Sequence, residues 1–182
     1  MFDAGVSDVA LPAGARWYDW WAPAAVAIAG GTTVTSDVSA RERIPLYVRE
    51  GAIIPLDVVD DTNGIGTTAS AGALTLLVWP ASAESTFVLH ELDDTTTALR
   101  AQQTATGASI TLARTLRTTL LRIRADAAPT AVRDGAMTLT PHADRAAFDA
   151  AATGAFYETS TASIWIKLAA LATERTITMT TL

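Results

Sequence analysis

The sequence predicts an all-β protein of two antiparallel β-sandwich domains, and three observations support this fold class. Short runs of β-branched and aromatic residues recur along the chain and are separated by turn residues, as in β-sandwiches. Hydrophobic residues make up 49% of the 182 residues and charged residues 18%, so the chain can fill a packed core. No stretch alternates strands with amphipathic helices, which argues against an α/β fold.

The alternation of side chains identifies the expected strands. In 119–124, Leu121 and Ile123 point to one side of the pleat while Arg122 points to the other. Asp134-Gly135 lies between two such runs and predicts a two-residue hairpin turn. The alanine-rich segment 143–152 is the one candidate for a short helix. The expected strands are 16–21, 32–36, 46–49, 53–56, 74–79, 86–91, 109–112, 119–124, 130–133, 137–140, 155–158, 163–168 and 176–180.

A polar, glycine-containing segment divides the chain. Residues 60–68 read DDTNGIGTT and separate two apolar blocks, which is typical of a linker. We therefore expect a small first domain over 1–62 and a second domain over 67–182.

Composition excludes several functions. The formal net charge of −6 argues against nucleic acid as a partner, because phosphate binding needs a basic face. The chain has no cysteine, which excludes disulfides and thiolate metal sites. The first residues do not read as a signal peptide, and the longest apolar run, 20–29, is too short for a bilayer and is broken by Pro23. We expect a soluble chain without a membrane partner; the compartment stays open, with the cytoplasm slightly favoured.

Two motifs in the first domain resemble those of a known family. Residues 11–21 read LPAGARWYDWW, and residues 43–56 read RIPLYVREGAIIPL. In this order and at this distance they are similar to the strands that follow the catalytic barrel in glycoside hydrolase family 31, the α-glucosidase and α-xylosidase family. Residues 86–94, TFVLHELDD, resemble the start of that family's distal domain, but His90 replaces the usual tyrosine and no glycine follows Asp94.

The resemblance implies a non-catalytic role. The family's nucleophile and general acid lie on an upstream (β/α)₈ barrel, so no catalytic residue, cofactor or metal ligand is carried onto this chain. The resemblance implies that the isolated chain is inactive and that the parent protein hydrolyses α-glycosidic bonds. It also implies that the first sandwich is truncated at Met1, and we expect the edge left unpaired to promote self-association.

The aromatic strand and one arginine are the expected docking residues. On a strand, Trp17 and Trp21 share one face, whereas Tyr18 and Trp20 share the other. Large rings on both faces require that both be covered, one by the domain core and one by the barrel. Arg49 is the candidate for an ion pair with the barrel. The alternative is that these rings stack on sugars, in a stand-alone carbohydrate-binding module.

Other polar residues are weaker candidates. Glu91, Asp93 and Asp94 end an expected strand and fit a solvated turn; calcium binding or catalysis are the alternatives. The two histidines lack the spacing of a metal site, although His142 and Asp144 could form a dyad. A solvated turn is favoured for the carboxylates, and an exposed or locally hydrogen-bonded imidazole is favoured for the histidines.

Overall fold

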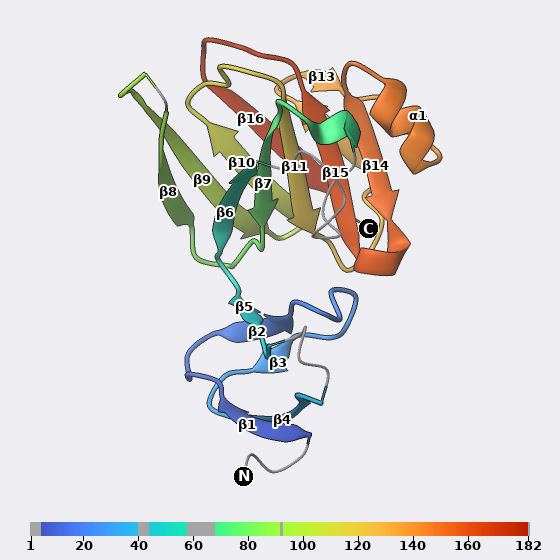
Figure 1. The fold of residues 1–182 in the computed structure, drawn as a ribbon. Coiled ribbons are helices and arrows are strands. Elements are labelled where there is room, and N and C mark those ends of the chain that lie inside the picture. Colours follow the sequence, from blue (N-terminus) through green and yellow to red (C-terminus); the bar gives the residue numbers. More distant parts are fainter. Residues whose placement is uncertain (1–4, 40–43, 58–67, 92, 182) are drawn as a thin grey trace. The chain divides into compact units, whose positions relative to one another are not determined.

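The fold is almost entirely β-structure and consists of two compact units. A computed structural model, drawn in Figure 1, describes residues 5–39, 44–57, 68–91 and 93–181. The units span Met1–Glu50 and Gly51–Leu182. Within the described residues, the regular elements other than strands are one six-residue helix and two short 3-10 turns. The all-β prediction is confirmed.

The first unit contains two small antiparallel sheets. One pairs β1 with β4, and the other places β2 between β3 and β5. Among the described residues of this unit, the buried apolar side chains are Leu11, Tyr18 and Val48. Its core is therefore thin. The strands are β1 (Val6–Ala10), β2 (Arg16–Asp19), β3 (Ile28–Ala29), β4 (Thr33–Asp37) and β5 (Tyr47–Arg49).

The second unit is a sandwich of two larger sheets. The six-stranded sheet has the order β13-β12-β16-β10-β9-β8, and the five-stranded sheet has the order β14-β15-β11-β7-β6. All pairs are antiparallel except β7 with β11. The strands are β6 (Ile53–Asp57), β7 (Leu74–Val78), β8 (Ser85–His90), β9 (Thr96–Thr104), β10 (Gly107–Leu112), β11 (Thr119–Arg124), β12 (Ala131–Asp134), β13 (Met137–Thr138), β14 (Gly154–Glu158), β15 (Ser163–Leu168) and β16 (Arg175–Thr180).

The five-stranded sheet is buried on both faces. Leu121 and Ile123 belong to the hydrophobic core between the sheets, as their alternation predicts. Leu77, Leu120 and Trp165 are equally buried but lie outside that cluster, on the other face. The helix α1 (Arg145–Ala150) packs beside β14 and contacts η1 (Thr68–Ser70). These two short elements contribute to a second, smaller apolar layer.

Most predicted strands are present, and the differences have local causes. The strand expected over 16–21 ends at Asp19, because the Asp19 carboxylate accepts a hydrogen bond from the Trp21 N–H at 2.8 Å and turns the chain. The longest strand, β9, was not predicted: alanine and glutamine fill four of the nine positions in its sequence TTALRAQQT. It nevertheless alternates, since Thr97, Leu99 and Ala101 are buried. Strands β1 and β3 were also not predicted.

The units divide earlier than the composition suggests. The linker predicted at 60–68 lies almost wholly outside the described residues. The boundary between the units falls after Glu50. Strand β6, which was predicted to belong to the first domain, pairs with β7 of the second unit from Ile53 to Asp57. Strand pairing, which is non-local, decides this assignment.

Candidate functional site

The five predicted docking residues lie on or next to β2 and β5. Tyr18 is buried at 6% exposure, opposite Val48 in the register, so it belongs to the unit's own core. The Trp17 ring is half-buried, and its Nε1 donates to the Pro12 carbonyl at 3.0 Å. Arg49 is exposed and pairs with Trp17 across the sheet.

The other two rings follow the strand rather than belonging to it. Trp20 is half-buried, and its N–H donates to the Leu46 carbonyl at 3.0 Å. Trp21 is 41% exposed, while its Nε1 donates to the Ile44 carbonyl at 2.7 Å. The expected pairing of rings on two faces of one strand therefore applies to Trp17 and Tyr18 but not to Trp20 and Trp21. Their docking role stays a prediction.

An ion pair between Arg16 and Glu50 connects the start of β2 to the end of β5. The Glu50 carboxylate accepts from the Arg16 backbone N–H and from Arg16 Nε, both at 2.8 Å. The Glu50 N–H donates in return to the Arg16 carbonyl at 2.9 Å. Burial acts to raise the pKa of Glu50, but the hydrogen bonds and charge of Arg16 outweigh it and leave the pKa below its ordinary value of 4.5.

This ion pair predicts an acid-sensitive first unit. Because the folded-state pKa of Glu50 is depressed, its contribution to stability is complete above the ordinary value of 4.5 and is lost as the pH falls through the folded value. Denaturant unfolding of the wild type and of Glu50→Gln between about pH 3 and pH 7 should show a stability difference that shrinks toward the acid end. A difference that is constant over this range would contradict the prediction.

The first unit also carries an open groove. It has a volume of about 350 Å³, and its wall includes the exposed ring of Trp21 and the carboxylates of Asp19 and Asp37. Hydrogen bonds from Ser39 lower the pKa of Asp37. An indole face beside carboxylates and hydroxyls is a surface that a sugar or a protein segment could occupy. The lining is Asp19, Trp21, Val34, Thr35, Ser36, Asp37, Ile44, Pro45, Leu46 and Tyr47.

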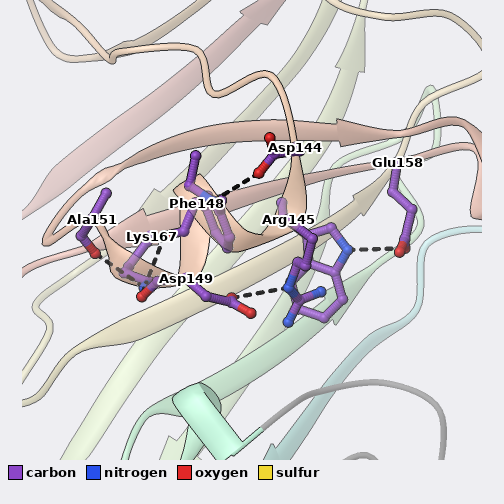
Figure 2. Close-up of polar contacts among 9 residues, drawn as sticks. Asp144, Arg145, Phe148, Asp149, Ala151, Glu158 and Lys167 are labelled. Carbon is purple, nitrogen blue, oxygen red and sulfur yellow. Dashed lines mark hydrogen bonds and ion pairs between the residues drawn. The ribbon is translucent and has the colours of Figure 1, made fainter.

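The second unit holds a buried lysine that sequence reasoning did not single out. Lys167, from β15, is 7% exposed and directs its ammonium group at the C-terminal end of α1. Its Nζ donates to the carbonyls of Phe148, Asp149 and Ala151 at 3.1, 2.8 and 3.0 Å (Figure 2). Burial lowers the pKa of Lys167, against the opposing charge of Asp149. Lys167 thus binds α1 to the sheet as a C-terminal cap.

Trp165 also contacts α1, because the guanidinium group of Arg145 lies over its ring. The Arg145 guanidinium carbon lies 4.5 Å from the centroid of the Trp165 ring, and Arg145 Nε donates to Asp149 at 2.9 Å. Trp165 Nε1 donates to the Glu158 carboxylate at 3.1 Å. The contacts of this cluster fix α1 against the sheet. Its members are scattered over 145–167, so only the tertiary structure brings them together.

The weaker sequence candidates are engaged in local structure. Asp93 accepts from the N–H and hydroxyl of Thr95, and Glu91 accepts from the Thr97 hydroxyl at 2.9 Å. Asp144 accepts from the Ala147 N–H at 2.8 Å as the N-cap of α1. The contacts of Glu91 and Asp93 are those of a turn, and the contact of Asp144 is that of a helix cap.

Among the described residues, no group of three or more histidines and carboxylates is arranged to hold a metal ion. Likewise, no helix in this part of the chain is long and apolar enough to cross a membrane.

Comparison with known families identifies the first unit. A family model described as the glycosyl hydrolase family 31 C-terminal domain matches residues 2–54. Residues 2–54, which include all the strands of the first unit, are therefore similar to this family's C-terminal domain. The resemblance inferred from the two motifs, and with it the prediction of a C-terminal region of a family 31 protein, is confirmed. A search of curated proteins gives no match.

Solved structures share the fold over nearly the whole chain. A cycloalternan-forming enzyme from Listeria monocytogenes matches with a TM-score of 0.85 and 22% identity over 99% of this chain and 17% of its own. A family 31 dextranase from Flavobacterium johnsoniae matches with a TM-score of 0.79 and 19% identity, over 99% of this chain and 25% of its own. An α-1,4-glucan lyase from Gracilariopsis lemaneiformis matches with a TM-score of 0.67 and 20% identity, over 98% of this chain and 21% of its own. The chain thus spans about a quarter or less of the length of these enzymes.

Proposed function

We propose that this chain is a non-catalytic module that supports the catalytic barrel of a family 31 glycoside hydrolase, and that the whole protein hydrolyses α-glycosidic bonds. The match of residues 2–54 to the family's C-terminal domain carries the proposal. The surface of the first unit also supports it, because Trp21, Ile44 and Leu46 are exposed by 38% to 68%. So many exposed apolar side chains on a unit with a thin core fit an interaction surface.

Within this proposal, the predicted docking residues have distinct roles. Trp17, Trp20 and Trp21 contact the barrel, and Arg49 pairs with one of its carboxylates. Tyr18, buried in the unit's own core, supports the strand that presents them. The module acts on catalysis indirectly, by holding the barrel wall and its loops in place.

The coding DNA upstream of Met1 provides the first test. We expect an in-frame barrel, and we expect the longer protein to hydrolyse p-nitrophenyl α-glucoside or α-xyloside while the 182-residue chain does not. Trp21→Ala in the longer protein should lower its melting temperature more than Val26→Ala, since Trp21 is the predicted contact. Turnover by the short chain that is abolished by Asp93→Asn would overturn the proposal.

Carbohydrate binding is a second candidate, favoured by the groove beside Trp21. A pyranose could stack on this ring while its hydroxyls donate to Asp19 and Asp37, which line the same groove. Isothermal titration with maltose, isomaltose and xylo-oligosaccharides tests this function. Saturable heat that is lost in Trp21→Ala and kept in Val26→Ala, which is outside the groove lining, would support it; absence of heat with all three sugars would contradict it.

A further inference from the structure

The outer edge of β8 is an unprotected strand edge. β8 is the last strand of the six-stranded sheet, and its backbone pairs with β9 over all six residues. The side chains of Thr86, Val88 and His90 are exposed, whereas Phe87 and Leu89 pack against the core. None of the three exposed side chains is a lysine, a carboxylate or a proline, the residues that commonly protect such edges.

The other edges of this sandwich are protected, in the part of the chain that the structure describes. β6 carries Pro55, which has no N–H to offer. β13 is only two residues long. At β14, the Ala155 N–H donates to the Thr140 carbonyl and the Ala155 carbonyl accepts from the His142 N–H, so a neighbouring segment already occupies that edge. β8 therefore differs from all three.

The register shows which backbone groups face outward. The Glu91 N–H donates to the Thr95 carbonyl at 2.9 Å, which makes Glu91 and Thr95 a hydrogen-bonded pair of the ladder between β8 and β9. Hydrogen-bonded pairs alternate along an antiparallel ladder, so Phe87 and Leu89 also direct their backbone groups to β9. The N–H and C=O groups of Thr86, Val88 and His90 consequently point to the free edge.

We propose that two copies of this chain associate through antiparallel pairing of β8 with β8, across a two-fold axis at Val88, so that their six-stranded sheets become continuous. In this register Val88 faces Val88, and Thr86 faces His90 of the second copy. All outward-facing groups then exchange hydrogen bonds, about six in total. Shifting the register by one pair in either direction loses part of these bonds, so this alignment is the preferred one.

The side chains also suit this arrangement. The two Val88 side chains, each 51% exposed in the single chain, become cross-strand neighbours on the outer face. On the inner face Phe87 becomes the neighbour of Leu89 from the other copy, which extends the core across the axis. No charged pair of like sign is brought into opposition. An isologous contact of this kind closes as a dimer and does not propagate.

Sedimentation of the 182-residue chain tests the association. The wild type and the conservative variant Val88→Thr should both show a concentration-dependent dimer. Val88→Lys, which opposes two ammonium groups at the axis, and Val88→Pro, which removes an outward N–H at an edge position, should each raise the dimer dissociation constant at least about tenfold. Melting temperatures equal to that of the wild type, measured at a concentration where all four proteins are monomeric, show that these variants fold. A wild-type monomer at several hundred micromolar, or dimerisation equal in all four proteins, would overturn the proposal.

Cysteine cross-linking tests the register, since the chain has no cysteine of its own. Val88→Cys should form a disulfide dimer on mild oxidation, because facing Cα atoms of a hydrogen-bonded pair lie about 5.5 Å apart. Thr86→Cys and His90→Cys should each fail to link to themselves but link to one another when mixed. Self-linking of Thr86→Cys as fast as that of Val88→Cys would rule out this alignment.

Discussion

Replacing Phe148 by alanine is expected to destabilise the second unit by about 3–5 kcal/mol. Phe148 is fully buried, and its ring lies 6.2 Å from the rings of His142 and Phe156. Lys167 Nζ lies 5.1 Å from the centroid of the same ring. A helix as short as α1 has little stability of its own, so it depends on this anchor. Denaturant unfolding followed by circular dichroism measures the loss.

Two further variants distinguish the effect of the buried Phe148 ring from the effect of helix propensity. Phe148→Leu keeps an apolar side chain of similar size and should cost under about 1.5 kcal/mol. Ala146→Gly, at an exposed helical position, changes only the helix propensity and should cost about 1 kcal/mol. If Phe148→Ala were no more destabilising than these, the second apolar layer would not contribute to stability as inferred.

Replacing Lys167 by methionine is expected to cost about 2–4 kcal/mol, although methionine keeps the length of the side chain. Three carbonyls at the end of α1 lose the same charged donor, and in a buried site the lost hydrogen bonds are not simply exchanged for water. Thermal unfolding of the full chain reports the effect, and near-ultraviolet circular dichroism of the neighbouring Trp165 reports the displacement of the helix.

Arg145→Met is the matched control for this variant. Arg145 also binds α1 to the sheet, but its side chain is 24% exposed and its Nη2 has no hydrogen-bond partner in the structure. Its removal should therefore cost only about 1 kcal/mol. An equal loss of stability in the two variants would show that the capping hydrogen bonds of Lys167 contribute no more than the contacts of Arg145.

Strands were predictable where the sequence alternates with strong strand formers. The bounds 119–124 and 163–168 agree with β11 and β15, because β-branched and aromatic residues recur there with turn residues on both sides. β9 was not recognised, since alanine and glutamine fill many of its positions and its identity as a strand comes from two neighbours. The helix was expected over 143–152 and spans Arg145–Ala150, where Asp144 supplies the cap.

The sequence by itself determined the fold class and revealed the resemblance to family 31, because strand periodicity and two contiguous motifs are local properties of the chain. Only the tertiary structure decided that β6 joins the second unit, that Tyr18 is buried while Trp21 is exposed, and that Lys167 caps α1. These features depend on which distant segments pair and pack together, and that choice is made by the burial of whole surfaces rather than by neighbouring residues.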